Sequence, residues 1–222
     1  LLIVGIIWGA VNLPGAIGRI SENSSIKNSK VVLYDGPKSI QDAKPEDLSV
    51  VSEAERDMTL KHSVDTKVLV NGKESYVYET NVNNTHTWVG SYMPDQSRTP
   101  ITYFDFDGTV EITVKVPNTD IKAVTVRPLK YDIKPEINTK KHTVTFRVNK
   151  PDAYTVEFNN STSRAVHIFA NEIEDPKDIP NKDDEDVFYI GPGEWNIENI
   201  VLSDNQTLYI SGGAVVHGIV NA

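Results

Sequence analysis

The sequence predicts an all-β protein in which an antiparallel β-sandwich is followed by the first coil, or coils, of a right-handed parallel β-helix. Between residues 60 and 170, β-rich runs recur roughly every ten residues with turn residues between them, which is typical of a sandwich. This region lacks the period of an amphipathic helix. From residue 186 the strands shorten and end at Gly, Asn or Ser, which is typical of stacked coils.

The first part of the chain is interpreted as an export signal. Residues 1–11 form an apolar run, and residues 1–18 fit a signal peptide whose charged start is missing. A transmembrane helix needs about 20 apolar residues, so no stable membrane span is expected. Two alternatives stay open for this run, a buried strand or short helix and a membrane anchor. Residues 19–59 are a polar lead-in, and the signal peptide predicts a secreted protein.

The predicted sandwich, residues 60–170, contains clear local evidence for antiparallel strands. Asn71-Gly72 lies between the β-rich runs 66–70 and 75–80, and both turn residues tolerate a positive φ, so we expect a hairpin there. In the run Val110–Val116 apolar and polar residues alternate strictly. Alternate side chains of a strand point to opposite faces, so this strand has one buried face and one wet face.

Residues 171–185 are predicted to form an acidic linker. They hold seven acidic residues against two lysines, with two prolines and little apolar content. Carboxylates are calcium ligands, but the regular spacing of a known calcium loop is missing, so no metal site is predicted. No cofactor is predicted either, because no helix follows the glycine-rich turns of the next region to bind a phosphate.

Residues 186–222 are predicted to begin a parallel β-helix. Short apolar runs alternate there with glycine-rich or polar turns. The runs are residues 187–190, 200–202, 207–210 and 214–216. The chain stops inside this pattern without a closing helix or polar cap, so we expect that the solenoid is truncated and that more protein follows.

Two regions of the sequence carry a resemblance to known enzymes. Residues 190–218, IGPGEWNIENIVLSDNQTLYISGGAVVHG, resemble the first coil of β-helix polysaccharide hydrolases, which include the polygalacturonase family and the dextranase/isopullulanase family. The runs 75–80, 124–129 and 155–159 are similar to the amino-terminal β-sandwich of the dextranase-type enzymes. The resemblance covers about residues 60–222 and is more specific for the superfamily than for a substrate.

The resemblance implies hydrolysis of glycosidic bonds by two carboxyl groups. One protonates the leaving oxygen, and the other activates water or attacks the sugar. In these families the catalytic aspartates lie on middle coils, and no carboxylate of this chain matches their motifs. We therefore assign no catalytic residue and expect the catalytic coils to be missing from the chain. The sequence around His217 lacks the first glycine of the Gly-His-Gly motif of polygalacturonases. His217 is therefore predicted to be a turn residue.

Trp88 and Tyr92 are the predicted substrate-binding residues. They flank a loop that contains Gly90 and Pro94, and aromatic faces pack well on the apolar face of a sugar ring. For each of them the alternative is packing in a core or between domains. Strand alternation at residues 101–106 predicts a further division, because it places Phe104 and Phe106 on a core-facing side and Tyr103 and Asp105 on the opposite side.

Charge and composition limit the partners. The chain has 22 Lys and Arg against 31 Asp and Glu, which gives a formal net charge of −9. This argues against a nucleic-acid partner, because duplex binding needs a basic face. It also favours a neutral glucan over a polyanionic polysaccharide, because like charges repel. There is no cysteine, which excludes disulfides, thiolate zinc sites and cysteine nucleophiles.

These observations favour one function and leave two alternatives. The favoured function is the amino-terminal part of a secreted polysaccharide-degrading glycoside hydrolase, dextranase-like or polygalacturonase-like. The alternatives are a carbohydrate-binding β-sandwich module and a non-catalytic surface or adhesive β-solenoid. Aspartates clustered on consecutive later coils favour the enzyme, and their absence favours the scaffold.

Overall fold

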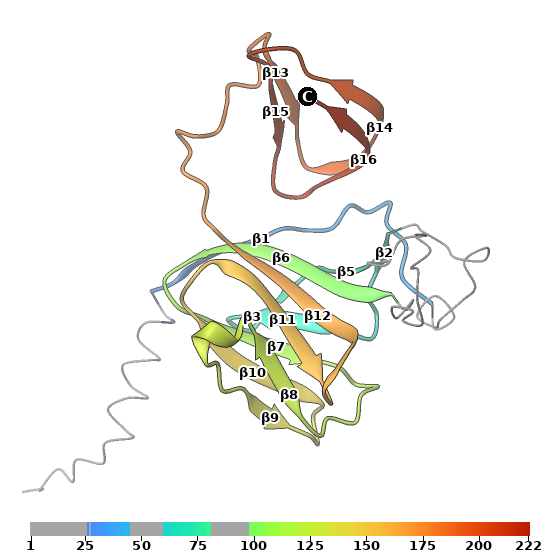
Figure 1. The fold of residues 1–222 in the computed structure, drawn as a ribbon, viewed down its shortest axis with the longest axis vertical. Helices are drawn as coiled ribbons and strands as arrows, with labels where there is room; N and C mark the ends of the chain where they lie inside the picture. The colour runs from blue at the N-terminus through green and yellow to red at the C-terminus, as the bar shows by residue number, and fades with distance from the viewer. Residues whose placement is uncertain (1–25, 27, 45–59, 81–97) are drawn as a thin grey trace, which may run out of the picture.

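The computed structural model describes residues 26, 28–44, 60–80 and 98–222 (Figure 1). Nearly all regular structure in these residues is β-strand, so the prediction of an all-β protein is confirmed. The predicted signal peptide and most of the polar lead-in lie outside the described residues. Within the described part of the chain, no helix is both long and apolar enough to cross a membrane.

The described residues between 30 and 172 form two sheets, which we call the two-sheet unit. The larger sheet has seven strands. Its path is β2 (Lys61–His62), β5 (Val77–Thr80), β6 (Thr99–Asp107), β12 (Ser161–Glu172), β11 (Asp152–Phe158) and β8 (Val124–Arg127), with β1 (Lys30–Leu33) also paired to β6. The smaller sheet has five strands, in the order β4 (Lys73–Ser75), β3 (Lys67–Val70), β7 (Val110–Lys115), β10 (Thr143–Val148) and β9 (Glu136–Asn138).

One hydrophobic core lies between the two sheets. Its buried side chains come from alternate positions of strands in both sheets, as expected for strands with one apolar face. In β7, Val110, Ile112 and Val114 are fully buried, while the residues between them are partly exposed. Phe104 and Phe106 of β6 belong to the same core, which confirms the predicted division of that strand.

The predicted hairpin forms, but its second strand is shorter than expected. Asn71 and Gly72 connect β3 to β4 with φ values of 49° and 79°. The run 75–80 was expected to continue this hairpin, whereas the chain leaves the smaller sheet after Ser75 and enters the larger sheet as β5. Ser75 and Val77 are both buried, so the crossing between the sheets places apolar and small residues in the core on either side of Tyr76.

The larger sheet departs from the predicted antiparallel arrangement at one pair. Strands β6 and β12 run parallel, with Tyr103 opposite Phe169. A parallel pair needs a long crossover connection, and residues 108–160 supply it through β7, β8, β10 and β11. Local alternation is the same in parallel and antiparallel strands with one buried face, so it carried no information on this pairing.

Residues 187–221 form two parallel strand pairs, which we call the paired-strand unit. Strand β13 (Val187–Ile190) pairs with β15 (Thr207–Ile210), and β14 (Gly193–Val201) pairs with β16 (Ala214–Asn221). Val187 is opposite Thr207 and Gly193 is opposite Ala214, so the chain returns to the same place after 20 or 21 residues. Strands β14 and β16 are longer than the predicted runs, and their register shifts between Asn196 and Asn199.

A polar corner closes the edge of the two-sheet unit near the short 3-10 helix η3 (Leu129–Tyr131). The Tyr131 hydroxyl donates to the Asp152 carboxylate at 2.7 Å, and the Lys130 ammonium lies 2.9 Å from the same oxygen. The hydrogen bond from Tyr131 and then that from Lys130 lower the pKa of Asp152 to about 2. The charged form of Asp152 is therefore favoured in the folded protein.

We expect the Asp152→Asn variant to unfold at a higher pH than the native protein during acid titration. A lowered folded-state pKa gives stability that is present above the unfolded value, near pH 4, and is lost as the pH falls through about 2. Circular dichroism between pH 5 and 1.5 measures the midpoint, and an NMR titration of the carboxyl carbon measures the pKa directly. Asp120→Asn, on an exposed carboxylate, is the matched control; an equal shift in that variant contradicts the prediction.

Candidate functional site

The two predicted substrate-binding residues, Trp88 and Tyr92, lie outside the described residues. The described residues fix the strand positions on either side of them. Thr80 at the end of β5 is paired with Thr99 at the start of β6, so the intervening segment begins and ends on neighbouring strands. The assignment of Trp88 and Tyr92 to sugar binding stays a prediction.

Five aromatic rings form a row along the outer face of the seven-stranded sheet. The row runs from His62 through Tyr76, Tyr78 and Tyr103 to Tyr34. Successive ring centroids are 4.4, 4.7, 6.2 and 5.4 Å apart. We call these rings the aromatic row. Stacked and tilted aromatic pairs at such distances add to the stability that burial provides.

A segment after β1, residues 34–43, covers part of the aromatic row. Gly36 lies directly on the Tyr76 ring, since a Cβ placed there would come within 2.2 Å of it. The backbone of Ala43 donates to the His62 carbonyl at 2.8 Å, and Ile40 and Ala43 are buried. We call residues 34–43 the strap. The strap holds the aromatic row against the sheet and leaves its Tyr34 end facing the paired-strand unit.

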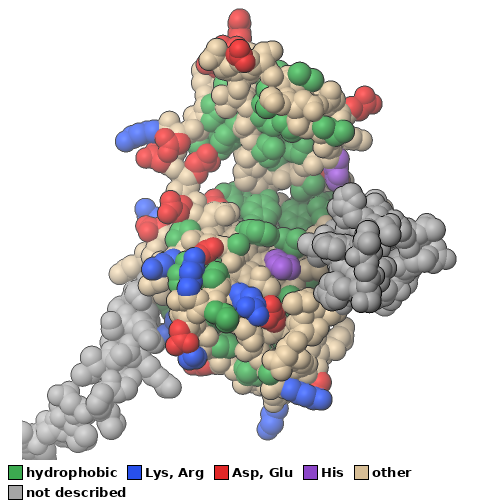
Figure 2. All heavy atoms as spheres, viewed as in Figure 1, with side chains coloured by type: hydrophobic (Ala, Val, Ile, Leu, Met, Phe, Trp, Pro, Cys, Tyr) green, Lys and Arg blue, Asp and Glu red, His purple; other side chains and the backbone are tan. Residues whose placement is uncertain are grey.

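The turn between β15 and β16 lies against the Tyr34 end of the aromatic row. The backbone N–H of Gly213 donates to the Tyr103 hydroxyl at 3.1 Å. A Cβ on Gly212 would come within 2.2 Å of the Tyr34 ring, so the turn approaches the ring as closely as a glycine allows. In Figure 2, hydrophobic side chains gather where the paired-strand unit faces the two-sheet unit. The aromatic row is therefore also the contact between the two units.

Glu194 of β14 adds a polar contact to this junction. Its carboxylate accepts a hydrogen bond from Ser39 of the strap and lies 2.9 Å from Nε2 of His217 on β16. The hydrogen bonds from Ser39 and then from His217 lower the pKa of Glu194. His217 lies inside strand β16, so the prediction that it is a turn residue was wrong.

A groove of about 680 Å³ opens beside the junction. Its walls come from the outer face of the seven-stranded sheet, the first part of the predicted linker and the β15–β16 turn. The lining residues used below are Tyr34, Tyr103, Asp105, Asn171, Glu174 and Ser211. Groove volumes of roughly 300–1,000 Å³ are typical of small-molecule sites, which often lie between domains. We call this space the junction groove and take it as the candidate functional site.

Asp105 is the most buried carboxylate in the junction groove, with 8% of its surface exposed. Within the described residues its hydrogen bonds come from two neutral groups. The Tyr34 hydroxyl donates a short bond to Oδ2, and the Asn171 amide lies 3.4 Å from Oδ1. Burial, and then the hydrogen bond to Asp105, raise the pKa of Tyr34, so its hydroxyl stays protonated and keeps donating.

The rim of the groove is held by a second tyrosine–carboxylate pair. The Tyr209 hydroxyl donates to Glu174 at 2.6 Å, and this bond is the main cause that raises the pKa of Tyr209 to about 12. Tyr209 also stacks on Tyr189 with ring centroids 5.0 Å apart. The pair fixes the start of the acidic segment against the paired-strand unit and so sets the position of one wall of the groove.

The groove carboxylates do not form a metal site. Among the described residues, no group of three or more His, Asp or Glu side chains is arranged to hold a metal ion. The histidines there have other contacts. His62 pairs with Asp42, His142 contacts the Thr119 carbonyl, and His167 contacts Thr155 while burial lowers its pKa.

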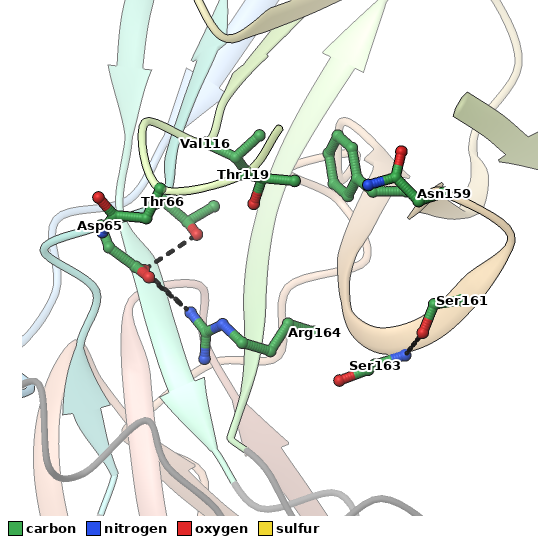
Figure 3. Close-up of a pocket in the computed structure, with 10 residues that line it drawn as sticks. Asp65, Thr66, Val116, Thr119, Asn159, Ser161, Ser163 and Arg164 are labelled. Carbon is green, nitrogen blue, oxygen red and sulfur yellow. Dashed lines mark hydrogen bonds and ion pairs between the residues drawn. The ribbon is translucent and has the colours of Figure 1, made fainter. Parts of the chain in front are cut away.

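A second pocket, at the opposite end of the two-sheet unit, is smaller and its charged groups are already paired (Figure 3). Its guanidinium, Arg164, contacts both Asp65 oxygens at 2.9 and 3.1 Å and both Glu79 oxygens at 3.2 and 3.0 Å. Glu79 also accepts from Ser63, and Arg98 donates to the Glu79 carbonyl. We call these five residues the Arg164 cluster, and we interpret it as structural because the guanidinium is occupied.

The chain is similar to solved structures, although sequence comparisons find no match. No protein-family profile and no curated protein matches the sequence. Among solved structures, the chain is similar to Dex49A from Penicillium minioluteum, with a TM-score of 0.54 and 16% sequence identity. The match covers 86% of this chain and 50% of that chain, so this chain spans half the length of Dex49A. At this level of identity the likeness shows a shared β-rich fold.

Proposed function

We propose that this chain is the amino-terminal part of a secreted polysaccharide-degrading glycoside hydrolase of the dextranase type. In this proposal the two-sheet unit is an accessory β-sandwich and the paired-strand unit is the start of a right-handed parallel β-helix. The catalytic carboxylates lie on later coils. The observation that carries the proposal is the likeness to the dextranase Dex49A, because it extends over 86% of the chain.

The pairing in the paired-strand unit supports the solenoid part of the proposal. Strands β13 and β14 each align in parallel with the strand found 20 or 21 residues later. Parallel strands joined by a crossover in one sheet are almost always connected with a right-handed turn. Large side chains also remain exposed on β16, including Ile219 and Val220, where a further coil would stack.

The charge of the junction supports a neutral polysaccharide rather than a polyanion. The residues that line the junction groove include five carboxylates and, within the described chain, no lysine or arginine. A field of this sign repels polygalacturonate and has little effect on a neutral glucan. A neutral glucan is therefore the proposed substrate.

The proposal predicts that the 222-residue chain alone does not hydrolyse polysaccharide, whereas the whole protein does. The measurement is release of reducing sugar from dextran, pullulan and polygalacturonate by equal concentrations of the two proteins. Hydrolysis requires two carboxyl groups on either side of the scissile bond, which the proposal places on later coils. Hydrolysis by the 222-residue chain contradicts that placement. Inactivity of both proteins favours a sugar-binding module or an adhesive solenoid.

A further inference from the structure

We propose that the junction groove is a carbohydrate-binding subsite that holds a short neutral oligosaccharide through Asp105, Asn171 and Ser211. The ligand class follows from the hydrogen-bonding groups of the groove and from their charge. The choice of a glucan as the probe rests on the proposed function. The site itself is separate from hydrolysis, since it lies between the two-sheet unit and the paired-strand unit.

Two buried polar groups in the groove have hydrogen-bonding capacity that the described residues do not use. Asp105 is more than nine-tenths buried, and its Oδ1 has one long contact, with the Asn171 amide at 3.4 Å. The Ser211 hydroxyl oxygen is buried and has no hydrogen-bond partner among the described residues. A carboxylate can accept about four hydrogen bonds, and a hydroxyl can both donate and accept. Buried groups of this kind are normally satisfied, so their shared groove suits a ligand.

The hydroxyl groups of a sugar complement this set of partners. A sugar hydroxyl donates to the Asp105 carboxylate, and hydrogen bonds to charged groups are the stronger ones. A neighbouring hydroxyl bonds to Ser211, whose own hydroxyl can donate or accept. The Asn171 amide supplies a further donor and acceptor beside Asp105. A metal ligand is disfavoured, because within the described residues no group of three or more acidic or histidine side chains is arranged to hold a metal ion.

The tyrosines of the groove contribute edges and hydroxyls rather than stacking faces. The Tyr34 ring stacks on Tyr103 and has Gly212 against it, and Tyr103 stacks in turn on Tyr78. These contacts fix the ring positions, so the wall next to Asp105 is rigid. Ile210 and Ala214 add apolar surface at the same wall. Small-molecule sites commonly combine apolar walls with a few fixed polar groups in this way.

Acidic residues around the groove determine which sugars enter it. Asp105 is joined there by Glu172, Glu174, Asp175 and Asp178. A uronic-acid oligomer would bring further negative charges close to these carboxylates, and their repulsion weakens its binding. A neutral oligosaccharide avoids that cost. The subsite therefore discriminates by charge, whatever the linkage of its ligand.

The test is titration of the 222-residue chain with isomaltotriose, followed by ¹⁵N NMR and calorimetry, with trigalacturonate as the charged comparison. We expect isomaltotriose to shift the amide signals of Asn171, Ser211 and Gly212, and trigalacturonate to leave them unchanged. Asp105→Asn should weaken binding about tenfold or more, since it removes a charged acceptor. Ser211→Ala should weaken it about threefold. Asp120→Asn removes the same charge from an exposed site and should leave the affinity unchanged.

A second variant keeps the proposal testable if Asp105→Asn fails to fold. Glu172→Gln removes charge at an exposed position of the groove and should strengthen binding of trigalacturonate relative to isomaltotriose. The proposal is overturned if isomaltotriose causes no shifts at the groove, if Asp105→Asn binds as the native chain does, or if both oligosaccharides bind equally. Binding and hydrolysis are measured on different proteins. An inactive whole protein with an intact groove affinity refutes only the proposed hydrolase function.

Discussion

Replacing Gly212 with alanine is expected to separate the paired-strand unit from the two-sheet unit. The added Cβ would lie 2.2 Å from the Cε1 and Cζ atoms of the Tyr34 ring. That is far inside van der Waals contact, and Tyr34 cannot move away easily because it also stacks on Tyr103. The turn must therefore leave the aromatic row, and the hydrogen bond between Gly213 and Tyr103 is lost with it.

Two measurements check this result. Small-angle X-ray scattering should show a larger radius of gyration. Limited proteolysis should cut the acidic segment after β12 several-fold faster, because the paired-strand unit no longer packs against the segment. Gly191→Ala is the matched control, since its nearest contact to an added Cβ is Tyr189 at 3.9 Å, an ordinary distance. Compact Gly212→Ala protein with native proteolysis would show that the turn does not hold the junction.

A double-mutant comparison separates the steric effect from a general loss of stability. Tyr34→Ala removes the ring that meets the new Cβ. The Gly212→Ala change should then cost much less in the Tyr34→Ala background than in the native protein, because the two residues are in contact. Equal costs in the two backgrounds would place the effect of the alanine elsewhere in the turn.

Removing Arg164 is expected to destabilise the two-sheet unit by about 3–5 kcal/mol, which is the usual cost of leaving a buried charge without its partner. Glu79 has no exposed surface, and Arg164 contacts both of its oxygens. Arg164→Met keeps the length of the aliphatic chain while removing the charge. Urea denaturation at pH 7 measures the change in the free energy of unfolding. Lys67→Met breaks an exposed pair with Glu74 and should cost less than about 1 kcal/mol.

The pH dependence of that variant gives a second test. Burial is the main cause that raises the pKa of Glu79 in the native protein, and Arg164 opposes it. Without Arg164 the pKa rises further, so the folded state takes up a proton at a higher pH than the unfolded state does. The stability deficit of Arg164→Met should therefore be largest near neutral pH and shrink as the pH falls towards the unfolded value, about 4.3. A deficit that stays constant from pH 7 to 4.5 contradicts this account.

The parts of the fold that sequence predicts well are those with a local cause. The alternation in β7 and the Asn71-Gly72 turn each depend on a few neighbouring residues, and both form as expected. The sheet change at Tyr76 and the parallel pairing of β6 with β12 depend on partners far along the chain. No short pattern specifies such partners, because a strand with one buried face looks the same whichever neighbour it has.

The candidate site shows the same limit more strongly. Alternation placed Tyr103 and Asp105 on the outer face of their strand, which the structure confirms. Tyr34 and Ser211 join them only through the packing of the strap and of the β15–β16 turn. Sequence reasoning interpreted Gly212 as a residue of a tight turn, and its close approach to Tyr34 gave no local signal. The contact could have been found only by considering tyrosines before the predicted linker as partners of glycines after it.

The strap and the turn that meets it are made at very different times during protein synthesis. Tyr34 leaves the ribosome long before Gly212, and translation at roughly 5–20 residues per second separates them by about 10 to 35 seconds. The two-sheet unit can fold once β12 has been made, about 2 to 8 seconds before Gly212 at the same rate, since its core needs no residue beyond β12. The Tyr34 end of the aromatic row then stays open to solvent and to chaperones. Docking of the turn onto Tyr34 therefore follows the folding of the two-sheet unit.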